Sequence, residues 1–218
     1  MLVIFDLDGT IVDSRLDLAN STNEVLESYG AAPLAVNEIA GMVGEGARRL
    51  VQRARAAAGL GVPLDEALAR FRAVYDRRLL EHTRPYPGIP EAVRHARTHA
   101  RLAVLTNKPE SPSRRLLEAF GLLEPFEWVL GGDSGFPRKP DPAAVAHLME
   151  RAGAGATDTL FVGDSMIDVE TARRAGVPVC VARYGFGHLR GELALRGDEL
   201  IAAAPSDISG IVDRFVSG

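Results

Sequence analysis

Short apolar runs alternate along the chain with longer segments of helical periodicity. The runs are apolar at successive positions, which is typical of strands that are covered on both faces. They lie at Leu2–Phe5, Leu102–Leu105, Trp128–Leu130, Leu160–Val162 and Val177–Val181. The helical patterns between them cover Pro90–His99, Pro112–Phe120, Pro142–Ala152 and Ile167–Ala175. Repeated strand–helix units of this kind predict an α/β fold, a doubly wound parallel sheet with right-handed crossovers.

The stretch between the first and second predicted strands departs from this alternation. Residues 15–84 carry three or four helical patterns and no convincing strand. From Leu64 to Leu79, apolar side chains recur at positions i, i+3, i+4 and i+7, which gives one apolar stripe. We therefore expect a small all-helical domain at residues 15–84, inserted into an α/β core made of residues 1–14 and 85–218.

Composition narrows the class of protein. The 218 residues, 46% of them hydrophobic, suffice for one large domain or for a core with a small insert. The net charge of −4 and the lack of a Lys/Arg run argue against a nucleic-acid partner. The one cysteine, Cys180, cannot form an internal disulfide and is expected to be a buried strand residue. No segment has membrane-spanning length and no signal-peptide pattern opens the chain, so we expect a cytoplasmic protein without a membrane partner.

Polar residues gather at the ends of the predicted strands. The first strand runs into DLDGT, from Asp6 to Thr10, the second into TNK from Thr106, and the fourth into GDSMID, which ends at Asp168. The stretch RKPDP, with Lys139, opens a helix. Each piece alone is typical of a turn, a helix cap or a surface charge. In a doubly wound sheet, however, ligands bind beyond the carboxyl ends of the strands, so together these side chains predict one site for a cation and a phosphate.

The four stretches DLDGTIVDS, LTNK, RKPDP and GDSMID resemble the four motifs of the haloacid dehalogenase superfamily of phosphotransferases. They span residues 6–168, and the helical insert resembles the cap of the branch in which a cap follows the first motif. The resemblance implies a Rossmann-like core and a Mg²⁺ cofactor. It also implies transfer of a phosphoryl group from a small phosphorylated metabolite through an aspartyl-phosphate.

The resemblance also implies roles for individual acids. Asp6 would be the nucleophile. Mg²⁺ would be held by the side chains of Asp6 and Asp164 and by the backbone carbonyl of Asp8, in the oxygen ligation that this ion prefers. Asp168, one helical turn beyond Asp164, would not contact the metal directly but would orient water or Lys139. The side chain of Asp8 would act first as general acid and then as general base.

The remaining motif residues fit phosphate chemistry. Thr106 and Asn107 are implied to donate hydrogen bonds to the transferring phosphoryl group, and Lys139 to offset its charge. The dehalogenase members of the superfamily lack the second acid of the first motif, so the presence of Asp8 favours a phosphate ester as substrate. The phosphonate-cleaving members use a cap lysine, and residues 15–84 contain none. A mutase has the same core residues and therefore remains an alternative function.

The insert contains a glycine-rich turn, GMVGEGARRL, that enters a helix. Backbone N–H groups at a helix start suit a small anion such as a carboxylate, although a plain turn between helices is an equally good interpretation. The pattern G-x-G-A-x-x-L resembles the phosphoglycolate phosphatases of the superfamily, which implies that Gly44, Gly46 and Arg48 bind the substrate. Glu45 departs from what an anion site needs, because it places a negative charge there.

The expected reaction is Mg²⁺-dependent hydrolysis of a small phosphomonoester, with 2-phosphoglycolate first among the substrates. The alternatives among enzymes are an inorganic pyrophosphatase, a sugar phosphatase and a β-phosphoglucomutase-like enzyme. A receiver domain, which also forms an acyl phosphate on a strand-end aspartate, is the alternative without catalysis, although receivers are shorter and lack an insert. The connections Val12–Arg15 and Glu81–Pro87 are predicted hinges that let the cap open and close. We expect a monomer or a homodimer.

Overall fold

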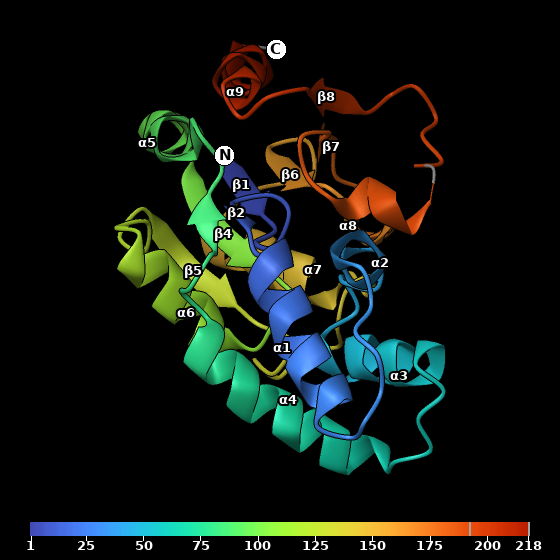
Figure 1. Cartoon of the computed structure of the whole chain (residues 1–218). Helices are drawn as coiled ribbons and strands as arrows, with labels where there is room; N and C mark the ends of the chain where they lie inside the picture. The colour runs from blue at the N-terminus through green and yellow to red at the C-terminus, as the bar shows by residue number, and fades with distance from the viewer. Residues whose placement is uncertain (192, 218) are drawn as a thin grey trace.

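The computed structural model describes residues 1–191 and 193–217. Its centre is a six-stranded sheet in the order β5-β4-β1-β6-β7-β8, whose neighbouring strands are parallel (Figure 1). The strands are β1 (Leu2–Phe5), β4 (Arg101–Leu105), β5 (Phe126–Leu130), β6 (Thr159–Gly163), β7 (Val179–Ala182) and β8 (Leu200–Ala202). The predicted α/β fold with a doubly wound parallel sheet is confirmed.

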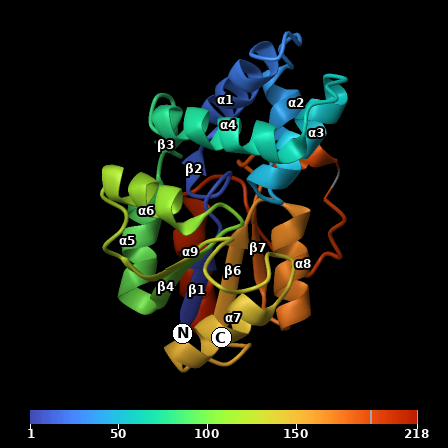
Figure 2. The ribbon, with the colours of Figure 1, turned by 90° about the horizontal axis from the view of Figure 1, so that it is seen from below.

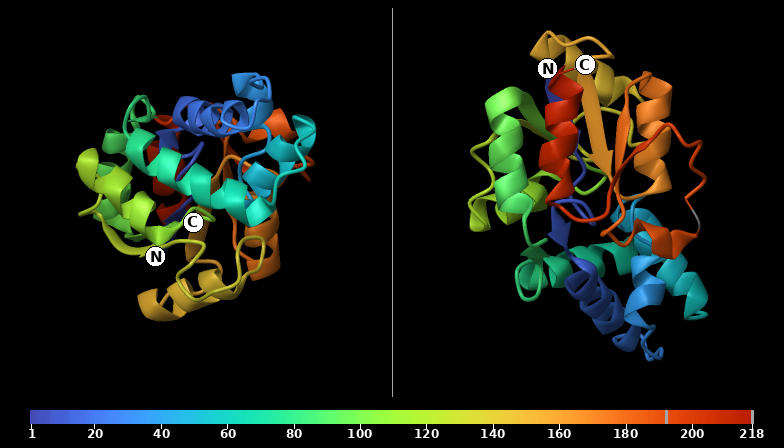
Figure 3. Two further views of the ribbon diagram at one scale, coloured as in Figure 1. Left: turned by 60° about the horizontal axis from the view of Figure 1, so that its bottom comes forward. Right: turned by 90° about the horizontal axis from the view of Figure 1, so that it is seen from above.

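Helices cover both faces of the sheet. They are α5 (Ile89–His99), α6 (Glu110–Ala119), α7 (Ala143–Ala152), α8 (Met166–Ala175) and α9 (Asp207–Ser217). Along β1, Val3 and Phe5 face the core shared with α5, α6 and α9, whereas Leu2 and Ile4 face the core shared with α7 and α8. Because side chains alternate across a strand, burial on both faces requires the unbroken apolar run seen in the sequence. Figure 3 shows α5 and α9 side by side on one face.

The start of β7 differs from the prediction. The sequence placed it at Val177, but the strand begins at Val179 because the preceding helix extends its cap into this region. Gly176 ends α8 in the left-handed conformation, and the N–H of Val177 donates to the carbonyl of Ala172 at 3.0 Å. Within β7, Cys180 is buried and forms no disulfide, as expected.

Two elements near the C-terminus were not predicted. β8 has three residues at the edge of the sheet, and Ile201 in its middle is 42% exposed, so its apolar signal is weak. Helix α9 follows it and packs against α5. At the other edge, β5 begins at Phe126 rather than at Trp128. Among the described residues, no helix combines the length and the apolarity needed to cross a bilayer.

The predicted insert forms helices between two short strands. The helices are α1 (Arg15–Glu27), α2 (Val36–Ala40), α3 (Ala47–Ala57) and α4 (Leu64–Arg78). Strands β2 (Val12–Asp13) and β3 (Arg84–Pro85) pair antiparallel, so the chain leaves and re-enters the core side by side. Buried Phe71 of α4 stacks on Tyr75, and α4 packs against α1 and α3. Figure 2 shows these helices beyond the carboxyl ends of the strands.

A buried carboxylate fastens the base of this insert. Asp17, in the first turn of α1, is fully buried. It accepts hydrogen bonds from the N–H of His82 at 2.9 Å, the N–H of Thr83 at 2.8 Å and the hydroxyl of Thr83 at 2.7 Å. A buried charge is tolerated when donors surround it in this way. Asp17 thus joins the start of α1 to the connection that precedes β3.

Candidate active site

The ends of three neighbouring strands place the polar motif residues at one edge of the sheet. Asp6 follows β1 and continues the sheet, since its N–H donates to the carbonyl of Val162 at 2.9 Å. Thr106 follows β4 in the same way, with its N–H 3.0 Å from the carbonyl oxygen of Leu130. Asp164 follows β6 directly. These positions are fixed by the sheet rather than by flexible loops, which gives the site a rigid floor.

Lys139 lies between two of the acids. Its Nζ is 2.8 Å from Asp6 Oδ1 and 2.6 Å from Asp168 Oδ1, and all three side chains are buried. Burial opposes a charge on Lys139, but Asp168 and Asp6 outweigh it and raise the lysine pKa above its usual value. Burial also raises the pKa of Asp6, to about 7, although Lys139 limits the rise. The lysine therefore stays charged and holds one oxygen of Asp6 in place.

The chain itself engages both oxygens of Asp168. Oδ1 accepts from Lys139, and Oδ2 accepts from the N–H of Ser165 at 3.0 Å and from its hydroxyl at 2.7 Å. The Ser165 hydroxyl and Asp168 form a capping box at the start of α8. Asp168 is fully buried, so its place in the structure is that of an anchor for Lys139 and for the helix.

Three carboxylates crowd together beside Lys139. One oxygen from each of Asp6, Asp164 and Asp168 can be chosen so that all lie within 4.8 Å of one another. The N–H of Gly187 donates to Asp164 Oδ2 at 2.7 Å. Burial, and then the charges of Asp168 and Asp6, raise the pKa of Asp164 well above its usual value. A divalent cation with a preference for oxygen ligands would relieve this repulsion, so the donor set fits such an ion.

Glycines let the strand-end loops close tightly around Asp164. Gly9 has a φ of 89°, and a Cβ on it would collide with the Asp164 carboxylate. A Cβ on Gly185 would collide with the carbonyl of Gly9 and with Asp164. The glycine of the DLDGT motif is therefore needed both for its backbone conformation and for the close approach of the Asp164 carboxylate.

The second acid of the motif has its own partners. Asp8 Oδ1 accepts a hydrogen bond from the hydroxyl of Ser14 at 2.6 Å. Lys108 Nζ lies 3.2 Å and 3.3 Å from the two carboxylate oxygens of Asp8, and it also contacts the hydroxyl of Tyr75. Lys108 had no predicted role. One signal was available, because Lys108 and Lys139 are the only two lysines in the chain.

The two polar residues after β4 differ in what they can still donate. The oxygen of the Thr106 hydroxyl accepts from the N–H of Lys108 at 3.2 Å, which leaves its own hydrogen for a ligand. The Asn107 amide donates to the carbonyls of Gly44 at 2.9 Å and Lys139 at 3.0 Å. Its oxygen accepts from the N–H of Lys139 at 2.9 Å. The Asn107 side chain therefore has no hydrogen left for a phosphate and instead joins the Lys139 loop to the Gly44 turn.

Part of the predicted cap motif reaches the site. Gly44 and Gly46 have φ values of 119° and 85° and lie against Asn107. Arg48 does not join them: its side chain is about half exposed and pairs with Asp65. Successive helix residues diverge by about 100°, so when Ala47 of α3 faces the site, Arg48 turns away from it.

The negative charge of Glu45 is taken up within the structure. Its carboxylate accepts from Arg53 at 2.8 Å and from Arg190, whose side chain comes from the segment after β7. Burial opposes the charge, but Arg190 and Arg53 lower the pKa of Glu45 below its usual value. Glu45 therefore ties the insert to the core and does not oppose an anion in the site.

A cavity of about 380 Å³ lies between the strand ends and the inserted helices. Its floor includes Asp6, Asp8 and Thr106, and its roof includes Phe71 and Tyr75 of α4. A cavity of this size suits a small metabolite.

Residues 3–182 match the family model described as haloacid dehalogenase-like hydrolase. The chain belongs to this family. A phosphoglycolate phosphatase of Rhodospirillum rubrum is 47% identical over 193 residues, which cover 84% of this chain and 80% of the relative. Phosphoglycolate phosphatase 1 of Pseudomonas aeruginosa is 41% identical over 196 residues, 87% of this chain and 71% of the relative. A crystal structure described as a predicted phosphoglycolate phosphatase from Haemophilus somnus superposes with a TM-score of 0.89 at 32% identity, covering 96% of both chains.

These relatives confirm the enzyme class predicted from the motifs. This haloacid dehalogenase-like hydrolase is a phosphoric monoester hydrolase. The family match covers the whole helical insert and the sheet apart from β8, from Val3 of β1 to the end of β7. The residues at the strand ends therefore belong to the part of the chain that defines the family.

Proposed function

We propose that this hydrolase is a Mg²⁺-dependent phosphatase that transfers the phosphoryl group of a small phosphomonoester, 2-phosphoglycolate, to Asp6 and then to water. The observation that carries the proposal is the setting of Asp6. It lines the cavity, one of its oxygens is held by Lys139, and two further carboxylates lie beside it. A carboxylate in this position is a nucleophile whose charge is offset on one side.

In the first step, an oxygen of Asp6 attacks phosphorus while the ester P–O bond breaks. The Asp8 carboxyl gives its proton to the leaving oxygen, so the alcohol departs neutral. In the second step, the Asp8 carboxylate takes a proton from a water molecule. The hydroxide then attacks phosphorus, inorganic phosphate leaves and Asp6 is restored. Thr106, which lines the cavity and keeps a free hydroxyl hydrogen, donates to the transferring group.

In this proposal Asp6 and Asp164 would hold Mg²⁺ by their side chains, and Asp8 would hold it by its backbone carbonyl. When bound, the ion supplies positive charge between the anionic nucleophile and the anionic substrate. Asp168 serves as the anchor of Lys139, since both its oxygens are engaged by the chain. Lys139 supplies a second, permanent positive charge at Asp6.

The choice of 2-phosphoglycolate is supported by the names of the relatives at 47% and 41% identity and by a cavity sized for a small metabolite. We further propose that the enzyme works in the cytoplasm as a monomer or a homodimer. The buried, unpaired Cys180 supports a reducing compartment.

The test is release of inorganic phosphate from 2-phosphoglycolate, pyrophosphate, sugar phosphates and β-glucose 1-phosphate, each with Mg²⁺ and with EDTA. We expect the highest kcat/KM with 2-phosphoglycolate, loss of turnover in EDTA, and a loss of a thousandfold or more, roughly, in Asp6→Asn. A higher kcat/KM with another substrate overturns the substrate assignment. An active Asp6→Asn overturns the covalent route, and one lasting phosphate per chain without turnover points to a receiver.

A further inference from the structure

The charged side chains around the cavity are partly paired and partly unpaired. Four carboxylates line it, and each has an ion-pair or hydrogen-bond partner among the described residues. The pairs are Asp6 with Lys139, Asp8 with Lys108, Asp76 with Arg115, and Asp133 with the backbone N–H of Glu110. Three of these four acids are thus paired with a cation of the protein, and the fourth, Asp133, accepts from a backbone N–H.

Two guanidinium groups line the same cavity and have no such partner. Across residues 1–191 and 193–217, the side chains of Arg72 and Arg138 make no hydrogen bond or ion pair. Arg72 lies on α4, in the roof. Arg138 immediately precedes Lys139, whose amino group contacts Asp6. Two guanidinium groups without a carboxylate partner among the described residues therefore face whatever occupies the cavity, which Asp6 and Thr106 also line.

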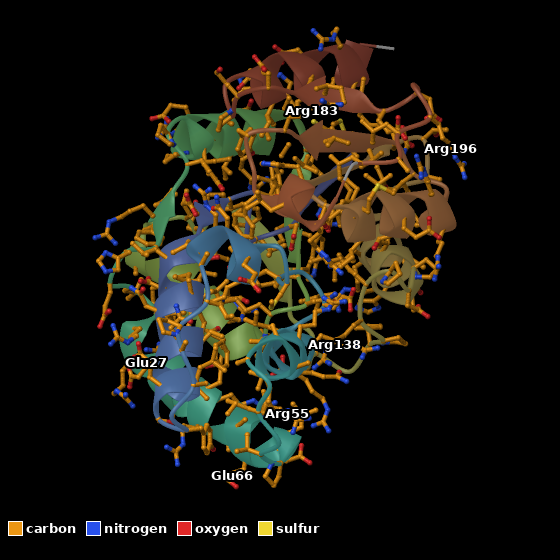
Figure 4. All side chains as sticks on the ribbon, turned by 45° about the vertical axis from the view of Figure 1, so that its right-hand side comes forward. Glu27, Arg55, Glu66, Arg138, Arg183 and Arg196 are labelled. Atoms are coloured by element: carbon orange, nitrogen blue, oxygen red, sulfur yellow. The ribbon has the colours of Figure 1, made fainter. Side chains whose placement is uncertain are left out.

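The position of Arg138 is defined by two glycines from different parts of the fold. A Cβ on Gly132, in the loop after β5, would lie 2.9 Å from Arg138 Nε. A Cβ on Gly46, in the insert, would lie 3.6 Å from the same nitrogen. The guanidinium therefore lies between the core loop and the Gly46 turn, and Figure 4 shows Arg138 beside the inserted helices. The start of α3 after Gly46 carries no side-chain cap, so its N–H groups add to the positive potential.

We infer that Arg138 forms a carboxylate subsite, which binds the carboxylate of the substrate while Asp6 and Thr106 act on its phosphoryl group. This inference rests on the proposed function and names the residue that selects the substrate. In 2-phosphoglycolate one carbon separates the carboxylate from the ester oxygen. The guanidinium that binds the carboxylate must therefore lie close to the residues that act on the phosphoryl group. Arg138 meets this condition, because it lines the same cavity as Asp6 and Thr106, and its Nε lies near the backbone carbonyl of Asn107, the residue after Thr106. Arg48, by contrast, points away and is paired with Asp65.

The experiment compares 2-phosphoglycolate with ethyl phosphate, which has a similar size but no carboxylate. Wild type, Arg138→Ala, Arg138→Lys and Arg48→Ala are assayed for kcat/KM with both substrates. We expect Arg138→Ala to lose about 10- to 100-fold with 2-phosphoglycolate, as removal of a charge-assisted hydrogen bond does, and to change by less than about twofold with ethyl phosphate. Arg138→Lys keeps the charge without the bidentate geometry and should lie between. Arg48→Ala should behave like wild type.

The outcomes separate the inference from the proposed function. If wild type prefers 2-phosphoglycolate and Arg138→Ala keeps that preference, the subsite is wrong and the proposed function stands. Equal losses with both substrates would assign Arg138 to the phosphoryl group and also overturn the subsite. If wild type instead prefers another carboxylated ester, such as phospholactate, and Arg138→Ala removes the preference, the subsite stands and the named substrate falls. If wild type has no preference for a carboxylate, both fall.

Discussion

Lys108 Nζ lies 3.2 Å and 3.3 Å from the two carboxylate oxygens of Asp8. The same nitrogen lies 2.5 Å from the hydroxyl of Tyr75, which belongs to the insert. Burial opposes the lysine charge, but Asp8 and Tyr75 raise the pKa of Lys108 above its usual value. Lys108 and Tyr75 are both buried. The setting of the proposed general acid is therefore complete only when α4 lies over the strand ends.

This relationship predicts an effect that depends on the leaving group. Lys108→Met keeps the volume of the side chain but removes the charge that orients Asp8. We expect kcat with ethyl phosphate to fall by about 100-fold, the usual size of a general-acid contribution. p-Nitrophenyl phosphate, whose leaving group needs little protonation, should lose far less. Steady-state kinetics with both esters provides the measurement. Equal losses would show that Lys108 acts on the phosphoryl group rather than through Asp8.

The crowded carboxylates predict that the charge of Asp164 destabilises the metal-free protein. Asp164→Asn removes one of three close negative charges and keeps an oxygen that can accept from Gly187. In EDTA we expect the free energy of unfolding to rise by on the order of 1 kcal/mol, the value of about one pKa unit. Thermal unfolding with and without Mg²⁺ measures it. Mg²⁺ should raise the Tm of wild type more than that of the variant. A variant less stable than wild type in EDTA would contradict the repulsion.

The hydrogen bonds of Glu199 predict that the protein loses stability as the pH falls. Its side chain is 2% exposed and accepts from Arg173 and from the N–H groups of Arg196 and Gly197. Although burial opposes its charge, these donors lower the pKa of Glu199 from 4.5 to about 2. A lowered pKa gives stability that is present above pH 4.5 and is lost as the pH falls towards 2.

The variant Glu199→Gln should therefore lower the free energy of unfolding at pH 7 by about 1–3 kcal/mol, the range for hydrogen bonds to charged groups. The difference from wild type should shrink between pH 4.5 and the lowest pH at which the fold persists. Urea unfolding across this range measures it. Glu170→Gln is the matched control, because its pair with Arg174 is exposed on both sides and should contribute much less to stability. A difference that does not vary with pH would refute the assignment.

The anchor at the base of the insert predicts a large structural effect. Asp17→Ala leaves the N–H groups of His82 and Thr83 without their acceptor in a buried setting. We expect a loss of about 3 kcal/mol or more in the free energy of unfolding, read from the urea midpoint. Asp65→Ala, at an exposed carboxylate of the same insert, should change it by less than about 0.5 kcal/mol. Similar effects of the two substitutions would mean that the buried hydrogen bonds do not hold the insert.

The sequence was most informative where burial was complete. β1 could be predicted because all four of its residues are buried, whereas β8 is short and half exposed and leaves no comparable pattern. The strand-end acids could be placed together because parallel strands bring their carboxyl ends to one edge. The insert could be located because its helical periodicity interrupts the strand–helix alternation.

Contacts between the insert and the core could not be read from spacing. Tyr75 and Lys108 are distant in sequence, and only the packing of α4 over the strand ends brings them together. The prediction for Arg48 came from a motif and did not include the direction in which the helix turns its side chains. Asn107 was expected to serve the phosphate, but the donors of a side chain cannot be allotted before its neighbours are known.

The scarcity of lysine has a practical side. An acylating reagent such as an activated ester has two lysine side chains to attack in this sequence, Lys108 and Lys139. Both side-chain amines are buried, so their rate of acylation, followed by peptide mass spectrometry, would report how often the enzyme uncovers its interior.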